Sequence, residues 1–179
     1  MPKVWILIKD IPVNGKEYSF DEPAMWEEPI SEFSLPYAIK HPLSAQVFLL
    51  AQQDGVLVRG RIKGQIAVPC DRCAEDAVID INHEFDTFEI IPDEDYVDNE
   101  ADGSLIGPAP EGAGVGIEIS RLLWEEFVLS LPAKPLCASK CKGLCPKCGK
   151  NLNDGDCGCD NEQYDPRLAA LRGLKVTKH

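Results

Sequence analysis

The eight cysteines of this chain fall into four close pairs, and this spacing constrains the fold more than any other feature. The pairs are Cys70/Cys73, Cys137/Cys141, Cys145/Cys148 and Cys157/Cys159. Two thiols separated by one to three residues suit a tetrahedral metal ion, because one tight turn can direct both sulfurs at it. Eight such ligands complete two four-sulfur sites without a coordination position for water. The spacing therefore predicts metal that stabilises the fold rather than metal that hydrolyses a substrate.

Zinc is the cofactor that we expect, with two ions per chain in four-cysteine sites. A disulfide framework is the main alternative, but it requires an oxidising compartment. The apolar run from Val4 to Ile8 is too short for a secretory signal, and no apolar stretch approaches the length of a membrane span. We therefore expect a cytoplasmic chain with no membrane partner, in which paired cysteines bind metal. An iron–sulfur cluster and a redox-active Cys-x-x-Cys pair are the remaining alternatives.

Four pairs can combine into two sites in three ways. Joining the third pair to the fourth needs a loop of only eight residues, which costs little closure entropy. The first pair then combines with the second and fastens distant parts of the chain together. An interleaved cross-brace is the alternative grouping.

Alternating apolar residues predict an antiparallel β-meander between residues 45 and 91. The first strand covers residues 45–51, and Asp54-Gly55 supplies a tight turn into the second strand, residues 56–68. The third strand begins near Ile79, and its apolar phase slips by Phe88 and Ile90, which suggests a bulge. The first cysteine pair lies in the connection between the second and third strands.

Residues 92–116 combine a run of carboxylates with Gly, Pro and Ala, a composition that predicts a mobile acidic loop. A helix follows, with Ser120 as its N-cap and Pro132 marking its end. Its buried face is expected to carry Ile119, Leu122, Leu123 and Phe127.

These patterns predict an α+β fold: an antiparallel β-meander with one main helix and a C-terminal cysteine-rich zinc-knuckle segment. Residues 1–42 form an N-terminal segment without a clear assignment, and residues 43–136 form the sheet and helix core around the loop 92–116. Residues 137–160 form the zinc-knuckle region, and residues 161–179 form a short helix and a basic tail.

The formal net charge of −12 argues against a nucleic-acid-binding body and would attract a basic partner, with ordinary solubility as the alternative interpretation of the acidic surface. Two groups of cations are nevertheless candidate RNA contacts. On the wet face of the second strand they are Arg59, Arg61 and Lys63, and among the cysteines they are Lys142, Lys147 and Lys150. The alternative for the first group is a solvated face, and for the second it is compensation of thiolate charge.

No catalytic constellation is present in the sequence. The three histidines, His41, His83 and His179, occupy unrelated settings, and His83 is expected to be structural. The chain has no Gly-rich phosphate loop before a helix, no nucleophile elbow and no His-Glu-x-x-His motif. We expect a non-enzyme with no small-molecule substrate.

Five segments carry a family resemblance. They are Val68-Pro-Cys-Asp-Arg-Cys73, Leu129-Ser-Leu-Pro132, Cys141-Lys-Gly-Leu-Cys-Pro-Lys-Cys-Gly149, Asn151-Leu-Asn153 and Asp165-Pro-Arg-Leu-Ala-Ala-Leu171. Together they resemble the bacterial YceD family of large ribosomal RNA subunit accumulation proteins, from about residue 43 to residue 174. The resemblance implies a role in 23S rRNA accumulation and large-subunit assembly. It also implies a link to a small basic zinc-binding ribosomal protein, beside which members are commonly encoded.

We therefore expect a non-enzymatic zinc-binding factor that supports 23S rRNA accumulation by engaging a basic ribosomal protein or ribosomal precursor particles. Direct binding of rRNA through the cations named above is the alternative function. A redox-sensing zinc switch is a third.

Overall fold

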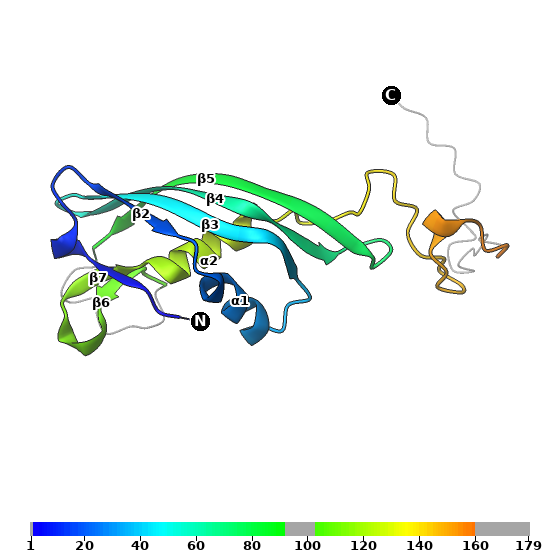
Figure 1. The fold of residues 1–179 in the computed structure, drawn as a ribbon, viewed down its shortest axis with the longest axis horizontal. Helices are drawn as coiled ribbons and strands as arrows, with labels where there is room; N and C mark the ends of the chain where they lie inside the picture. Colours follow the sequence, from blue (N-terminus) through cyan, green and yellow to red (C-terminus); the bar gives the residue numbers. More distant parts are fainter. Residues whose placement is uncertain (1, 92–102, 160–179) are drawn as a thin grey trace, which may run out of the picture.

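The computed structural model describes residues 2–91 and 103–159, which form two antiparallel sheets and two α-helices. The larger sheet has the strand order β2-β3-β4-β5, and the smaller has the order β1-β7-β6. The strands are β1 (Trp5–Leu7), β2 (Lys16–Phe20), β3 (Ala38–Ala51), β4 (Gly55–Pro69), β5 (Asp76–Ile90), β6 (Ile106–Pro108) and β7 (Val115–Glu118). The α-helices are α1 (Pro23–Glu32) and α2 (Ile119–Ser130), and both lie on the same side of the larger sheet (Figure 1). Residues 2–91 and 103–159 also contain three short 3-10 helices: η1 (Ile8–Asp10), η3 (Pro110–Gly112) and η4 (Leu152–Asp154).

The predicted meander is confirmed in β3, β4 and β5, which pair consecutively. Buried and exposed residues alternate along β4: Val58 and Ile62 are fully buried, while Arg59 is exposed. Residues two apart share one face of a strand, so one face of the sheet is apolar and packs against α2. The core between sheet and helix includes Phe127, which is fully buried.

The bulge predicted near the end of the third strand is wrong. The register between β4 and β5 runs without a shift from Gly55 opposite Ile90 to Pro69 opposite Asp76. Phe88 and Ile90 keep the phase of the strand and stand on its outer face, with exposed fractions of 41% and 67%. The register shifts lie between β3 and β4 on either side of His41, next to Pro42, which has no N–H to donate to the ladder.

The helix predicted before Pro132 is α2, and its four expected apolar residues are buried: Ile119, Leu122, Leu123 and Phe127. The predicted N-cap is wrong, because Ser120 lies inside the helix and its Oγ accepts a hydrogen bond from the Val4 backbone N–H at 3.1 Å. The chain enters α2 directly from β7, and the Ile119 N–H donates to the Val4 carbonyl at 2.9 Å. Pairing with the N-terminal segment therefore replaces a side-chain cap at this end of the helix.

The prediction of one main helix is incomplete, because α1 is a second helix of ten residues. It contains Pro23 in its first turn and Pro29 inside it, and proline inside a pattern argues against a helix in sequence reading. Burial stabilises it: Trp26 is 1% exposed, and its ring centroid lies 5.9 Å from that of Phe127 in an edge-on arrangement.

Part of the predicted loop 92–116 is ordered. Its second half forms the hairpin of β6 and β7, in which Leu105, Ile106 and Ala109 are buried. The N-terminal 42 residues also join the fold, since β2 pairs with β3 and β1 with β7. The acidic run 92–102 and the predicted C-terminal helix and tail, 161–179, lie outside the described residues.

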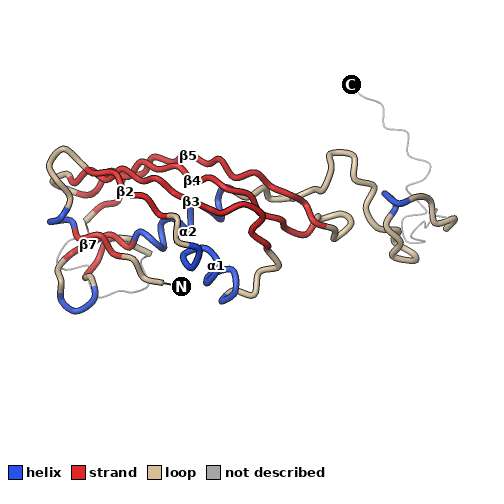
Figure 2. Tube along the Cα trace, in the orientation of Figure 1, coloured by secondary structure: helices blue, strands red, loops and turns tan. Residues whose placement is uncertain are grey.

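After α2 the chain continues as a loop past the tip of the β4–β5 hairpin, and the cysteine-rich segment extends beyond that tip (Figure 2). In the described parts of the chain, no helix is long and apolar enough to cross a membrane.

Candidate metal centres

The first cysteine cluster joins the β4–β5 connection to the segment after α2. It consists of Cys70, Cys73, Cys137 and Cys141, whose sulfurs all lie within 4.8 Å of one another. The Cys70 and Cys141 sulfurs are 3.9 Å apart, and the Cys73 and Cys137 sulfurs are 3.5 Å apart. Four sulfurs at 2.3 Å from a tetrahedral ion would stand about 3.8 Å apart. The observed spacing therefore fits one zinc-sized ion.

A tight turn directs the first two sulfurs into this cluster. The Cys70 N–H donates to the Glu75 carbonyl at 2.8 Å, and the Ala74 N–H donates to the Cys70 carbonyl at 2.9 Å. Ala74 takes a left-handed conformation with φ of 62°, which reverses the chain after Cys73. Both cysteines are 3% exposed, so the turn places its thiols inward, whereas Cys137 of the same cluster is exposed.

Hydrogen bonds favour the thiolate form at two sulfurs of the first cluster. The backbone N–H of Cys137 lowers the pKa of the Cys70 thiol to about 6, and the N–H groups of Arg72 and Cys73 act in the same direction. The Asn153 side chain, which donates to Cys141 Sγ at 3.3 Å, lowers the pKa of that thiol. By contrast, the Cys73 side chain raises the pKa of Cys137 to about 12. The cluster thus combines stabilised thiolates with a thiol proton that a bound cation would displace.

The second cluster lies within a single stretch of fifteen residues and consists of Cys145, Cys148, Cys157 and Cys159. Its knuckle turn is closed by hydrogen bonds from the Cys145 N–H to the Lys150 carbonyl at 2.8 Å and from the Gly149 N–H to the Cys145 carbonyl at 2.9 Å. The turn requires glycine at position 149, where φ is 73°. All four sulfurs again lie within 4.8 Å of one another.

The second cluster repeats the electrostatic pattern of the first. The backbone N–H of Cys148, followed by that of Lys147, lowers the pKa of the Cys145 thiol to about 6. The Cys148 side chain raises the pKa of Cys159 to about 12. In both clusters the first cysteine of a Cys-x-x-Cys turn is the sulfur best prepared to bind a cation.

Asn153 connects the two clusters. Its amide nitrogen donates to Cys141 Sγ, and its amide oxygen accepts from the Lys142 backbone N–H at 2.8 Å. The pattern Asn151-Leu-Asn153 favours side-chain to backbone turns and predicts a reversal of the chain toward Cys157 and Cys159, but it gives no signal of the contact between Asn153 and Cys141. The Asn151 side chain indeed accepts from the Asn153 N–H at 3.0 Å.

Gly143 allows the cysteine-rich segment to approach the hairpin turn. A Cβ at this position would lie 3.0 Å from the Arg72 carbonyl oxygen, and the same oxygen accepts from the Leu144 N–H at 3.0 Å. The Arg72 side chain donates to the Cys141 carbonyl at 2.8 Å. The two segments that carry the first cluster are therefore joined by backbone contacts as well as by their sulfurs.

The sulfurs are grouped as short loop closure favours, with the third pair joined to the fourth, and not as an interleaved cross-brace. The donor sets fit zinc, because each cluster offers four sulfurs within 4.8 Å of one another and no carboxylate or imidazole.

The candidate RNA contacts are spread over two separate places. On the outer face of β4, Arg59 pairs with Asp86 at 2.7 Å and Arg61 pairs with Glu84 at 2.6 Å, so carboxylates of β5 balance both guanidinium groups. Lys63 lies opposite Asn82 on the same face.

The lysines of the cysteine-rich segment differ from those arginines. Lys150 donates from Nζ to the Asp156 carbonyl at 2.9 Å. Lys142 and Lys147 are exposed, and their side chains pair with no carboxylate among the described residues.

His83 joins the sheet to the helix rather than serving a site. Its Nε2 lies 2.7 Å from Glu126 Oε2, so β5 and α2 are linked by a half-buried polar contact. This contact agrees with the structural role expected for this histidine.

Fold and clusters together define a small α+β protein with two candidate structural metal centres. Residues 58–175 match the family model described as large ribosomal RNA subunit accumulation protein YceD, and this range contains all eight cysteines. The match covers more than half of the chain, which therefore belongs to the YceD family.

Curated relatives include chloroplastic proteins and a mycobacterial one. The chain is 37% identical over 59 residues to "Large ribosomal RNA subunit accumulation protein YCED homolog 1, chloroplastic" of Arabidopsis thaliana, which covers 33% of this chain and 18% of the relative. It is 27% identical over 160 residues to the protein of the same name from Zea mays, covering 74% of this chain and 53% of that relative. An uncharacterized protein of Mycobacterium tuberculosis (strain H37Rv) is 29% identical over 118 residues, covering 66% of this chain and 55% of that protein. The chain thus spans about half the length of these relatives or less, and no solved structure significantly matches it.

Proposed function

We propose that this chain is a non-enzymatic factor that binds two zinc ions and supports 23S rRNA accumulation during assembly of the large ribosomal subunit. The observation that carries the proposal is the match to the YceD family, which is named for large ribosomal RNA subunit accumulation. The matched range contains every residue of the two sulfur clusters, so the metal centres and the family assignment concern the same part of the chain.

Zinc in these positions would supply structure rather than a reaction. Four thiolates fill a tetrahedral ion completely, so no position is left for a substrate or an activated water. The first centre would be held by Cys70, Cys73, Cys137 and Cys141, and the second by Cys145, Cys148, Cys157 and Cys159. The first would fix the segment after α2 to the hairpin tip, and the second would fold the fifteen-residue segment that contains it.

A basic ribosomal protein, free or within a precursor particle, is the partner that the charge supports best. The chain carries a formal net charge of −12, and two filled four-thiolate centres would add further negative charge. The arginines of β4 are balanced by carboxylates at 2.7 Å and 2.6 Å, which reduces their attraction for phosphate. Direct rRNA binding is the second candidate, and the observation in its favour is that Lys142 and Lys147 are exposed and pair with no carboxylate in the part of the chain that the structure describes.

The proposal is tested by complementation of a bacterial strain depleted of its own YceD-family protein. We expect the wild-type chain to restore the ratio of 23S to 16S rRNA and to sediment with large-subunit precursors. Replacing Cys73 and Cys157 with serine in one variant should abolish both effects, while Asn82→Ala, an exposed substitution outside the clusters, should not. A cysteine variant that restores 23S rRNA fully would contradict a need for the metal centres, and failure of the wild-type chain to restore it would contradict the role itself.

A further inference from the structure

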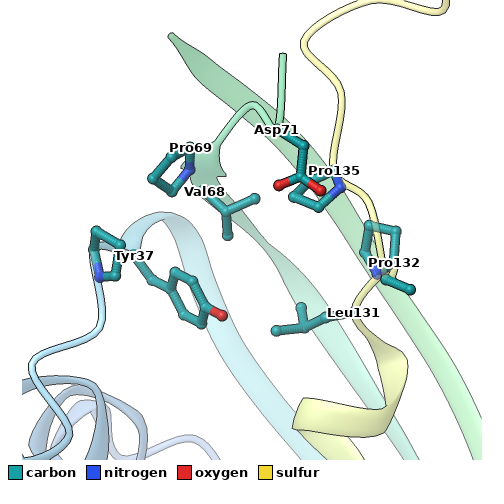
Figure 3. Close-up of a pocket in the computed structure, with 9 residues that line it drawn as sticks. Tyr37, Val68, Pro69, Asp71, Leu131, Pro132 and Pro135 are labelled. Atoms are coloured by element: carbon teal, nitrogen blue, oxygen red, sulfur yellow. The ribbon is translucent and has the colours of Figure 1, made fainter. Parts of the chain in front are cut away.

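A cavity of about 360 Å³ lies where the end of β4, the segment before β3 and the segment after α2 meet (Figure 3). Val68 and Leu131 contribute aliphatic side chains to its wall, and four prolines extend the apolar surface: Pro36, Pro69, Pro132 and Pro135. Its volume lies in the lower part of the range of about 300–1,000 Å³ that is typical of ligand-binding pockets. It has room for one long side chain and its backbone rather than for a folded element.

Two polar side chains, Asp71 and Tyr37, also line the cavity. Figure 3 shows the Asp71 carboxylate directed into it from the hairpin tip, with the half-buried Tyr37 ring on the opposite side. The Asp71 backbone N–H donates to the Pro135 carbonyl at 2.9 Å, which fixes the residue at the rim. No hydrogen bond or ion pair joins its carboxylate to another residue in the ranges 2–91 and 103–159.

We propose that this cavity binds a lysine or arginine side chain from an extended basic segment of a partner protein. The aliphatic stem of such a side chain packs on Val68, Leu131 and the prolines, while its charged end meets the Asp71 carboxylate. Charge complementarity decides the class of partner. A nucleic-acid phosphate placed here would meet Asp71 and the nearby thiolates of the first cluster, since Cys70 directly precedes Asp71 and Cys73 follows it by two residues.

The first cluster holds the two walls of the cavity together. Asp71 lies between Cys70 and Cys73, and Pro135 lies two residues before Cys137, so both walls continue directly into ligands of one proposed metal centre. The inference thus deepens the proposed function by assigning a contact site to its basic partner, and the binding test below is independent of rRNA accumulation. Removal of the first centre is expected to weaken binding without Asp71 being changed.

The test uses the full zinc-loaded chain and a fluorescein-labelled decapeptide of alternating lysine and alanine. Fluorescence anisotropy gives the dissociation constant, and amide chemical shifts of the isotope-labelled chain locate the contact. We expect Asp71→Asn to weaken binding about tenfold, as loss of one charge-assisted hydrogen bond implies. The matched control is Asp80→Asn, which changes net charge equally on the exposed face of β5 and should alter the affinity less than about twofold, as expected for a distant, screened charge.

Further probes separate this cavity from general attraction to an acidic protein. A peptide with glutamine in place of lysine should bind at least about tenfold more weakly, since it lacks the charge that pairs with Asp71. Equal losses in Asp71→Asn and Asp80→Asn, or shifts confined to residues outside the cavity, would overturn the inference. So would an oligouridylate RNA that binds more tightly than the lysine peptide and displaces it. If the peptide binds through Asp71 but the wild-type chain fails to restore 23S rRNA, the cavity assignment stands and the proposed function falls.

Discussion

The Asn153 side-chain amide donates a hydrogen bond to the Cys141 sulfur at 3.3 Å, although Asn153 belongs to the loop that closes the second cluster. The same amide accepts from the Lys142 N–H at 2.8 Å, so it is held on both sides. Polar groups in this position around a thiolate centre commonly decide how strongly the ligands hold the metal. The two centres are therefore expected to influence each other through one residue.

Asn153→Ala is predicted to weaken zinc binding at the first centre by about 10- to 100-fold, the usual effect of losing a hydrogen bond to a metal ligand. Competition with a chromophoric chelator measures the zinc affinities of the two centres. Only one of the two affinities, that of the first centre, should fall. Asn82→Ala, on the exposed face of β5, is the control that should leave both steps unchanged. Unchanged affinity in Asn153→Ala would show that the contact with Cys141 has no influence on the metal.

Loss of one ligand from each cluster is predicted to have different structural effects. Cys73→Ser should leave one zinc ion per chain and release the segment after α2 from the hairpin tip, which lowers the midpoint of thermal unfolding. Cys157→Ser should also leave one ion, but the sheet and α2 do not depend on the second cluster for their burial. Native mass spectrometry gives the stoichiometry, and a melt followed by far-ultraviolet circular dichroism gives the stability. Equal destabilisation by both variants would contradict this division.

The chelated, metal-free chain is predicted to be most stable near pH 9. The folded-state pKa values of Cys70 and Cys145 are lowered to about 6, so the stability they contribute is present above the ordinary thiol pKa of 9 and is lost as pH falls toward 6. Those of Cys137 and Cys159 are raised to about 12, so their contribution is present below pH 9 and is lost as pH rises toward 12.

Urea midpoints of the chelated chain between pH 5.5 and pH 10.5 measure this dependence. The rise in stability between pH 6 and pH 9 should be smaller when Cys70 and Cys145 are both replaced by serine, with the lowered pKa of Cys141 accounting for what remains. A wild-type profile that is flat across this range would show that the backbone N–H groups do not stabilise the two thiolates.

Phe127→Ala is predicted to destabilise the chain by about 3–5 kcal/mol, because a fully buried aromatic side chain leaves a cavity when it is removed. Phe127 contacts Trp26 of α1 at a centroid distance of 5.9 Å and Trp124 at 5.3 Å, so its loss loosens both helices. Leu129→Ala, at a position 72% exposed on the same helix, should change stability by less than about 0.5 kcal/mol. Chemical denaturation gives both values, and similar losses in the two variants would contradict the burial seen for Phe127.

Sequence patterns predicted those parts of the fold in which local periodicity and long-range packing agree. The sequence signals of β4 and α2 are strong, because in each element apolar residues recur over several turns or pairs of residues on the face that packs against the core. Cysteine spacing predicted the grouping of the sulfurs because loop closure favours near neighbours.

The features that sequence reading missed depend on contacts between distant segments. Helix α1 forms despite Pro29 because the packing of Trp26 compensates a weak local signal. Ser120 resembles an N-cap, yet its hydroxyl accepts from Val4, which is 116 residues away in the chain. The cavity at Asp71 was equally hidden, since its walls come from three separate segments.

The first cluster joins Cys70 to Cys141, which are 71 residues apart, whereas the second cluster lies within fifteen consecutive residues. An ion can therefore enter the second set of thiols while the rest of the polypeptide is still a random coil, but it can enter the first only after strands and helix have brought the two halves together. The order of metal capture should record the order of folding. Binding of the last ion would then mark the point at which the strands and the helix have already formed.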